Sequence, residues 1–297
     1  MALPLKHRGS RERAAPAGDA RFGLVQLRQR AWVAARNFLY AELVFGRGHD
    51  LAKPVYDRLI AIELAAARAR DGRFVFPPAS SVTALIKTFE RPQTVRRLVA
   101  SIHRLYPWMP IVVVDDSREP RDIPGTTVVK MPFDSGLSAG RNEGLRHVKT
   151  SNVLLLDDDF VLTRRTRVDA ALEALESPRI DLVGGRVSFL PFYLEQAKPE
   201  YGEGRIERWR MCEKVPNFFV ARTERLKLVP WDERLKLVEH MDFFLRAQGV
   251  LTTVYEPRME CLHARTLFDA HYMQKRAAVG PYVEILREKL AARGRAS

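Results

Sequence analysis

Short apolar runs alternate with amphipathic segments along the chain from Ser80 onward. Near-continuous apolar runs are typical of strands that a sheet buries on both faces. In the amphipathic segment TVRRLVASIHRLY, Val95, Leu98, Val99 and Ile102 share one helical face. Alternating strands and helices predict an α/β fold with a mostly parallel sheet flanked by helices. The predicted strands of this half are SVTALIKTF, IVVVDDS, TTVVKM and VLLLDDD, and two further predicted helices are GRNEGLRHVK and RVDAALEALES.

The pattern is less regular after DLVGGRV. Residues 190–216 are rich in Pro, Gly, Tyr and Glu, which predicts a long irregular connection that could serve as a lid or acceptor surface. A basic helix is expected from Tyr272 to Ala291, with an interruption near Gly280-Pro281. Between them we expect a strand at NFFVART, helices at ERLKLV and EHMDFFLRAQG, a last strand at TTVYEP and a loop at CLHARTLF.

The first part of the chain differs from the rest in composition. Its opening residues predict a disordered basic tail, and Phe22 to Tyr40 predict an amphipathic basic helix that lies on an anionic membrane or packs against the main domain. A second helix is expected from Ala52 or Pro54 to Arg70. The expected organisation is a tail at 1–20, a helical N-terminal extension at 21–78, the α/β domain at 79–270 and a C-terminal basic helix at 271–297.

The charge and cysteine content narrow the possible partners and the compartment. A net charge of +13 in 297 residues points to anionic partners, namely nucleic acid, acidic lipid headgroups or phosphorylated substrates. Cys212 and Cys261 are too few for a disulfide framework, and whether they pair is left open. No apolar run approaches the roughly 18 to 20 residues of a membrane span, and no signal peptide is evident. We expect a cytoplasmic chain, at most in peripheral contact with a membrane.

Three consecutive carboxylates, Asp157, Asp158 and Asp159, follow the apolar run VLLL. Adjacent anions near a partly dry strand end repel each other, so a cation, backbone donors or protonation must relieve them. Because strand side chains alternate, Asp157 and Asp159 are expected to point one way and Asp158 the other. Such a pair suits Mg²⁺ or Mn²⁺ that carries a diphosphate. The alternative is an Asp-rich turn that caps a helix beginning near Thr163.

Polar residues also follow the other predicted strands. Thr88, Phe89 and Arg91 follow the first strand, and Asp115-Asp116 end the second. Gly136 to Gly144 open a helix that contains Arg141, a fork-shaped donor for phosphate or carboxylate. Each feature alone is equally compatible with a surface turn. Ligands bind outside the carboxyl ends of strands in such sheets, however, so we expect one shared site.

The order of these motifs resembles a known family. TALIKTFERPQTVRRLVASI, VVVDDS, GLSAGRNEGL and VLLLDDDF resemble the nucleotide-sugar-binding half of family-2-like glycosyltransferases with the GT-A fold. The resemblance narrows to the catalytic domain of the beta-1,4-N-acetylgalactosaminyltransferases, the ganglioside synthase type, and covers about residues 80–265. It rests on MPFDSGLSAGRNEGL, LLLDDDFVLTRRTRV, DLVGGRV and VPNFFVARTERLKLVPWDERLKLVEHMDFFLRAQG.

The resemblance implies roles for individual residues in binding a UDP-sugar donor. Asp115 or Asp116 would contact the uridine, and Arg141 would position the diphosphate and the acidic cluster. Asp157 would lie by the ribose or metal-bound water, Asp158 would belong to the donor site, and Asp159 would ligate Mn²⁺ or Mg²⁺. The remaining donor-site residues would be Thr88, Phe89 and Arg91 in the nucleotide pocket and Gly184-Gly185 in a small-residue turn beside the donor sugar.

The catalytic step of an inverting transferase needs a base on the acceptor side of the sugar. His240-Met241-Asp242-Phe243-Phe244 matches the family pattern His-x-acid-Phe-Phe, so Asp242 is the first choice and Glu239, three residues earlier on the same helical face, the second. His263 falls where related transferases place a metal-binding histidine, although the family's preceding acidic residue is Leu262 here. Asn217 and Trp231 are candidates for acceptor contacts, and the alternative for Trp231 is that it covers the edge of the core.

The expected function is metal-dependent, inverting transfer of N-acetylgalactosamine or another hexosamine from its UDP form to a hydroxyl of a glycan or glycolipid. Two alternatives stay open. A metal-dependent nucleotidyltransferase acting on a sugar phosphate also sets carboxylates at strand ends. A basic nucleic-acid-binding protein is suggested only by the charge, and the sequence has no recognisable recognition helix or RNA-binding sheet motif, so no nucleic-acid partner is expected.

Overall fold

The computed structural model describes residues 49–193 and 196–294. The described residues from Lys53 onward form one compact unit that contains the sheet and the helices around it. The predicted disordered tail and the predicted amphipathic helix from Phe22 to Tyr40 lie outside the described residues.

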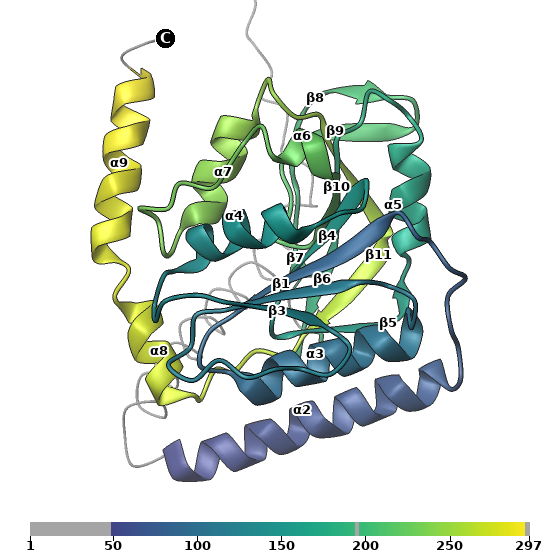
Figure 1. Cartoon of the computed structure of the whole chain (residues 1–297), viewed down its shortest axis with the longest axis vertical. Coiled ribbons are helices and arrows are strands. Elements are labelled where there is room, and N and C mark those ends of the chain that lie inside the picture. Colours follow the sequence, from purple (N-terminus) through teal and green to yellow (C-terminus); the bar gives the residue numbers. More distant parts are fainter. Residues whose placement is uncertain (1–48, 194–195, 295–297) are drawn as a thin grey trace, which may run out of the picture. The chain divides into compact units, whose positions relative to one another are not determined.

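One mixed sheet forms the centre of the unit (Figure 1). Its strand order is β3-β2-β1-β4-β10-β6-β11-β9-β8, with β5 paired to β11 and β7 paired to β6. The bounds are β1 Val82–Thr88, β2 Ile111–Asp115, β3 Thr127–Lys130, β4 Asn152–Asp157, β5 Phe160–Thr166, β6 Leu182–Phe189, β7 Gln196–Ala197, β8 Glu200–Ile206, β9 Trp209–Lys214, β10 Phe219–Arg222 and β11 Thr253–His263.

The first four strands in space, β3, β2, β1 and β4, run parallel, as the apolar runs predict. All seven residues of β1 are buried, and their side chains alternate between two hydrophobic cores. Ala84 and Ile86 belong to one core, and Leu85 belongs to the other. β10 is antiparallel to both of its neighbours, and β6 and β11 pair in parallel. The predicted α/β class with a helix-flanked sheet is confirmed.

Helices lie on both faces of the sheet (Figure 1). α3 contributes Val95, Leu98 and Ile102 to one core, and α7 contributes Phe243 and Phe244 to the other. The predicted helix before the sheet is confirmed as α2, where Ile60 and Ala67 pack in a third cluster. The bounds are α2 His49–Asp71, α3 Pro92–Leu105, α4 Leu137–His147, α5 Val168–Leu175, α6 Thr223–Leu226, α7 Glu239–Ala247, α8 Ala270–Ala277 and α9 Gly280–Gly294.

Three segments differ from their predictions. Residues 160–166 form strand β5, which pairs with β11, so no helix begins near Thr163. The predicted irregular connection at 190–216 contains an antiparallel hairpin, in which β8 pairs with β9 across a two-residue turn. The predicted loop at CLHARTLF begins as a strand, since β11 extends to His263 through a register shift between Tyr255 and Glu260.

The C-terminal basic helix is interrupted as predicted, between α8 and α9. α9 lies beside α7 (Figure 1), and Lys289 of α9 forms ion pairs with Asp232 and Asp242. Arg91 connects α8 to the end of β1, because its guanidinium carbon lies 3.8 Å from the ring centroid of Tyr272. Both helices are therefore attached to the α/β unit by charged side chains.

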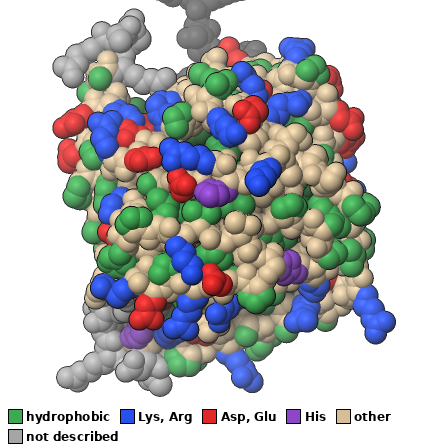
Figure 2. Space-filling view, in the orientation of Figure 1, with side chains coloured by type: hydrophobic (Ala, Val, Ile, Leu, Met, Phe, Trp, Pro, Cys, Tyr) green, Lys and Arg blue, Asp and Glu red, His purple; other side chains and the backbone are tan. Residues whose placement is uncertain are grey.

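The surface, the cysteines and the hydropathy of the helices bear on the predicted partners and compartment. On the face that Figure 2 shows, basic and acidic side chains are interspersed, so the excess positive charge does not form one continuous patch there. Cys212 and Cys261 are both buried and free. Among the described residues, no helix is sufficiently long and apolar to cross a lipid bilayer.

Candidate active site

The parallel strands bring their polar ends to one edge of the sheet, as expected. In the strand register, Thr88 of β1 lies opposite Asp115 of β2, and Lys87 lies opposite Asp157 of β4. This register is a direct consequence of the in-phase apolar runs, whose burial on both faces leaves polar residues only at the strand ends. The site is therefore assembled by the sheet itself, with loops and helices adding further groups.

Asp158 and Asp159 form a tight turn between β4 and β5. The three carboxylates, predicted to divide into Asp157 and Asp159 on one side and Asp158 on the other, differ in their partners. Asp158 and Asp159 share one partner, because Arg91 forms ion pairs with both, the latter at 3.1 Å. Thr88 Oγ1 also donates a hydrogen bond of 2.7 Å to Asp158 Oδ2. Asp157, which was expected to face the same way as Asp159, pairs with Arg141 instead.

The two carboxylates of the turn differ in acidity. Burial raises the pKa of Asp158 to about 6, although Arg91 acts in the opposite direction. Burial also opposes ionisation of Asp159, but His263 and Arg91 outweigh burial and hold its pKa well below its usual range. Asp159 is thus the more acidic member of the pair, and the ionised carboxylate is the form that binds a cation.

His263 lies beside Asp159, with 3.0 Å between His263 Nε2 and Asp159 Oδ1. The pairing of β5 with β11 positions the ring, because His263 lies opposite Phe160 in that ladder. Ala264 N donates a backbone hydrogen bond of 3.0 Å to Asp159 O, which fixes the two chain segments together. The structure therefore brings together Asp159 and His263, two of the three residues for which the sequence predicted a metal-binding role. The third, Asp157, forms its ion pair with Arg141.

Arg141 connects the acidic strand end to helix α7. Its side chain is only 1% exposed, with Nη2 2.8 Å from Asp157 Oδ1 and Nη1 2.7 Å from Glu239 Oε1. Asn217 Nδ2 donates a 3.3 Å hydrogen bond to the same Glu239 oxygen, and Asn217 Oδ1 lies 2.5 Å from His240 Nδ1. Asn217, predicted as an acceptor contact, thus also joins two residues of α7. A buried guanidinium with two carboxylate partners is well suited to fix their spacing.

The start of α7 has a strained backbone. Val238, which precedes Glu239, has φ of 58° and a left-handed conformation. This conformation is unfavourable for a β-branched residue and typically costs on the order of 1–3 kcal/mol. The strain is confined to the turn that directs Glu239 towards Arg141, which is consistent with a functional requirement on this turn.

Lys87 belongs to the site although the sequence analysis did not select it. Its ammonium group donates a 2.8 Å hydrogen bond to Thr88 O and forms an ion pair with Asp116. Burial lowers the pKa of Lys87, and Asp116 opposes this. Asp116 Oδ2 also accepts a 2.8 Å hydrogen bond from Gly136 N, so this carboxylate holds the loop before α4. The signal in the sequence that could have identified Lys87 is its position as a charged residue within an otherwise apolar strand.

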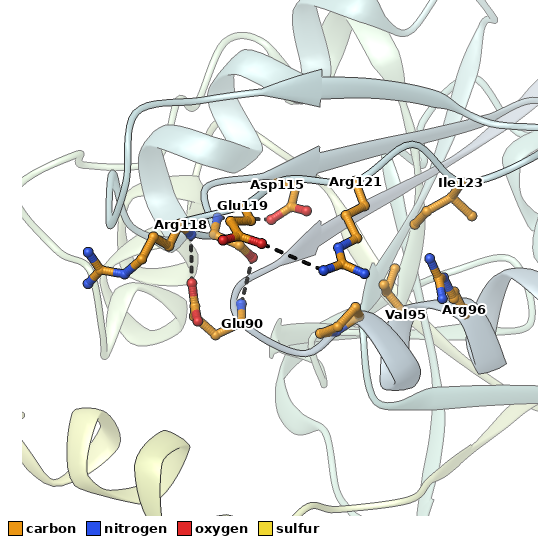
Figure 3. Close-up of a pocket in the computed structure, with 10 residues that line it drawn as sticks. Glu90, Val95, Arg96, Asp115, Arg118, Glu119, Arg121 and Ile123 are labelled. Atoms are coloured by element: carbon orange, nitrogen blue, oxygen red, sulfur yellow. Dashed lines mark hydrogen bonds and ion pairs between the residues drawn. The ribbon is translucent and has the colours of Figure 1, made fainter.

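Asp115 faces a different hollow, a cavity of about 390 Å³ (Figure 3). Asp115 Oδ1 accepts a 2.9 Å hydrogen bond from Ser117 N, and Arg96, Arg118 and Arg121 also line the cavity. The loops after β1 and β2 are joined here. Arg118 N donates a 2.6 Å hydrogen bond to Glu90 Oε1, and Glu90 N donates a 2.7 Å hydrogen bond to Ser117 Oγ.

A second cavity, of about 250 Å³, contains most of the other predicted donor-site residues. Thr88, Phe89, Arg91, Asp116 and Asp158 line it from the sheet edge. Further walls come from segments outside the strand ends, namely Asp134, Gly136, Leu137, Lys236 and Leu237 and, on the C-terminal helices, Tyr272, Lys275, Ala278 and Tyr282. Residues of the loop after β1 line both cavities, so the two hollows are adjacent.

Some predicted site residues lie elsewhere. Asp242 forms an ion pair of 2.8 Å with Arg246 and a second one with Lys289, and it does not contact Arg141 or the acidic turn. Trp231 is 3% exposed and stacks on Phe243, so it covers the core rather than presenting an open ring face.

Gly184 and Gly185 are also located differently from the expectation. They lie inside strand β6 and not in a turn. A Cβ at Gly184 would lie 2.3 Å from the side chain of Val215, and one at Gly185 would lie 2.5 Å from Met259 O. The absence of side chains at these two positions is therefore explained by close packing within the protein.

The residues present fit a divalent cation in part. Asp159 and His263 supply an oxygen and a nitrogen, which suit Mn²⁺, and Asp159 is held in its charged form. Within 49–193 and 196–294, no cluster of three or more His, Cys, Asp or Glu side chains offers a complete shell. Protein sites that bind a cation together with a substrate phosphate usually supply only one or two carboxylates. The donor set therefore fits a cation that arrives with, or is completed by, a phosphorylated ligand.

Comparison with known proteins identifies the sequence family. Residues 83–197 match the family model described as glycosyl transferase family 2. The chain contains a glycosyltransferase family 2 domain. The matched residues include β1 from Thr83 onward, Arg141 and the acidic turn. Helix α7, His263 and the C-terminal helices follow the matched segment.

The chain is similar to curated transferases over a longer segment than the family model matches. It is 38% identical over 193 residues to beta-1,4 N-acetylgalactosaminyltransferase 1 of Rattus norvegicus, and the match covers 57% of this chain and 36% of that protein. Beta-1,4 N-acetylgalactosaminyltransferase 2 of Mus musculus is 36% identical over 186 residues, with the same coverage of 57% and 36%. The chain thus spans about a third of the length of the curated relatives that it matches.

Solved structures that are similar to this one include Staphylococcus aureus TarS. The crystal structure of TarS 1–349 matches with a TM-score of 0.48 and 20% identity, covering 61% of this chain and 60% of that chain. The complex of TarS 1–349 with UDP matches with a TM-score of 0.49 and 18% identity, covering 61% and 60%.

Proposed function

We propose that the protein is an inverting glycosyltransferase that moves a hexosamine, most simply N-acetylgalactosamine, from a UDP-sugar to a hydroxyl of a glycan or glycolipid. The observation that carries the proposal is the assembly at one sheet edge of Asp158 and Asp159 with Arg91, His263 and the Asp157–Arg141–Glu239 chain. The family 2 domain and the N-acetylgalactosaminyltransferase relatives support the reaction class and the sugar.

The two cavities suggest how the donor lies. The uracil would occupy the hollow of about 390 Å³, where the Asp115 carboxylate accepts a hydrogen bond from the base. The diphosphate and sugar would occupy the hollow of about 250 Å³, beside Arg91 and Asp158. Arg91 pairs with both carboxylates of the acidic turn, and its guanidinium would be a donor for the phosphate oxygens of the nucleotide sugar.

Asp159 and His263 would hold Mn²⁺ or Mg²⁺. When bound, the cation neutralises charge that develops on the leaving diphosphate. The other tasks belong to the chain itself. Thr88 orients Asp158 through its hydrogen bond, Arg91 and Lys87 keep the edge electrically balanced, and Arg141 fixes Asp157 relative to Glu239.

The base that removes the acceptor proton would be a carboxylate of α7. The contacts favour Glu239, because Arg141 joins it directly to Asp157 at the edge of the donor site. Asp242, which the sequence motif favours, is held by Arg246 and Lys289 on the side of α9. We therefore propose Glu239 as the base and Asp242 as the residue that anchors α9, an order opposite to the one that the motif suggests.

A donor and acceptor screen tests the function. The protein is incubated with UDP-N-acetylgalactosamine, UDP-N-acetylglucosamine or UDP-galactose, Mn²⁺ and a panel of glycan and glycolipid acceptors, and UDP and product masses are measured. We expect UDP release that depends on acceptor, with highest turnover for a UDP-hexosamine. Release of pyrophosphate from a nucleoside triphosphate and a sugar phosphate, without UDP release in the screen, would instead establish a nucleotidyltransferase.

A further inference from the structure

The C-terminal helix α8 places a cation inside the cavity that the sheet edge opens. Lys275 lines this cavity together with Phe89 and Asp158. Its ammonium nitrogen lies 3.9 Å from the ring centroid of Phe89 and 4.8 Å from that of Phe133. The two rings are themselves 5.6 Å apart, so Lys275 is held at the aromatic wall of the cavity.

The charges around this cavity are balanced except at Lys275. Four cationic side chains line it, and three of them have a carboxylate partner that also lines it. Lys87 pairs with Asp116, Arg91 with Asp158, and Lys236 with Asp134 at 2.8 Å. Lys275 forms no ion pair with any residue in the described part of the chain, and its contacts are to ring faces. A partly exposed cation–π contact is weak enough for an anionic ligand to displace.

Residues at the start of α8 hold Lys275 in this position. Asp269 caps the helix, with a 3.0 Å hydrogen bond from Tyr272 N to Asp269 Oδ1. Tyr272 lies one turn before Lys275 and stacks against Arg91, the same arginine that pairs with Asp158 and Asp159. The helix is thus fixed to the acidic turn, and its lysine is directed into the adjoining cavity.

We propose that Lys275 is a donor-binding residue whose ammonium group binds the diphosphate of the nucleotide sugar, with α8 as the outer wall of the donor site. This inference rests on the proposed function. A lysine is a compact point charge with three donors, which suits the oxygens of a diphosphate. The residue lies outside the segment that matches the family model, so the chain supplies this contact from a part that the family match does not include.

Ligand titration by calorimetry tests the inference on the full chain in Mn²⁺-containing buffer. The ligands are UDP and uridine, and the variants are Lys275→Gln, Lys275→Arg and the charge-matched control Arg287→Gln, whose side chain is 69% exposed on α9. We expect Lys275→Gln to weaken UDP binding about tenfold, Lys275→Arg to stay within about threefold of wild type, and Arg287→Gln to match wild type. Uridine binding should be the same in all four proteins.

Three results would overturn the inference. UDP binding by Lys275→Gln that equals or exceeds the wild-type affinity would show that Lys275 does not bind the diphosphate. An equal loss of UDP and uridine binding would show that the substitution alters the base pocket or the fold. A wild-type protein that binds no UDP would refute the proposed function itself, and the inference with it, which separates the two failures.

Discussion

Arg141 Nη1 lies 2.7 Å from Glu239 Oε1, and this buried contact joins helix α4 to helix α7 behind the acidic strand end. The same guanidinium reaches Asp157 with its other nitrogen. Asp157 and Glu239, which are 82 residues apart in the sequence, are thereby held by one planar side chain. The contact sets the distance between the donor edge and the proposed base.

Removing the guanidinium should destabilise the protein as well as inactivate it. Arg141→Met leaves Glu239 buried without its cation, and we expect the free energy of unfolding to fall by about 3 kcal/mol in urea titrations. Arg141→Lys keeps the charge but cannot donate to both carboxylates as a guanidinium does, so we expect the free energy of unfolding to fall by about half as much. The exposed Arg146→Met on the same helix serves as the control and should change stability by less than about 0.5 kcal/mol. Equal stabilities for the Arg141 and Arg146 variants would contradict this account of the contact.

Substitution of the two acidic residues of α7, Glu239 and Asp242, should have different effects on the transfer rate. If Glu239 is the base, Glu239→Gln should lower the single-turnover transfer rate by about 100-fold or more at saturating donor, since removal of a general base typically costs 10²–10⁴-fold. UDP affinity should change little, because glutamine still accepts a hydrogen bond from Arg141. Asp242→Asn should mainly loosen α9 and reduce the rate less. The reverse ranking in rapid-quench measurements would restore Asp242 as the base.

The burial of His240 should make the folding stability of the protein depend on pH. Burial lowers the pKa of His240 to about 4, below the ordinary value of 6.5, so the folded protein favours the neutral ring. The unfolded chain binds the proton more readily, and stability is therefore retained above pH 6.5 and lost as the pH falls towards 4. With the ring partly accessible, we expect a loss of about 2 kcal/mol over this range.

The matched variant is His240→Gln, which cannot titrate. Its stability, followed by thermal unfolding at steps between pH 7 and pH 4, should decline by about 2 kcal/mol less than that of the wild type over that interval. Parallel declines in the two proteins would show that other groups cause the acid sensitivity.

The sequence predicts the sheet edge well, because burial on both faces leaves a strong signal. The near-continuous apolar strands β1, β2 and β4 can only end in polar residues at solvent, so Thr88, Asp115 and Asp157 are predicted at one edge and are found there. Strand β5 and the β8–β9 hairpin were missed for the opposite reason. Strand β5 is mostly buried but ends in Arg164, Arg165 and Thr166, and most of β8 is exposed, so neither segment shows a clear period of two.

Side-chain partners are harder to predict because they depend on long-range packing. The sequence does not indicate that Arg91 pairs with both carboxylates of the turn, Asp158 and Asp159, while Asp157 pairs with Arg141. Gly184 and Gly185 look like a flexible turn in the sequence, yet their function is close approach to Val215 and Met259. Lys87 and Lys275 gain significance only when the cavity between β1 and α8 is known.

The most direct test of the central claim is the effect of Mn²⁺ on UDP binding and on transfer in Asp159→Asn, His263→Ala and the wild type. The claim is that Asp159 and His263 hold a cation that binds the diphosphate of the donor. We predict that Mn²⁺ tightens UDP binding at least tenfold in the wild type, and that both variants lose this tightening together with acceptor-dependent UDP release. Asp159→Asn with wild-type transfer and undiminished Mn²⁺-dependent UDP affinity would contradict the claim.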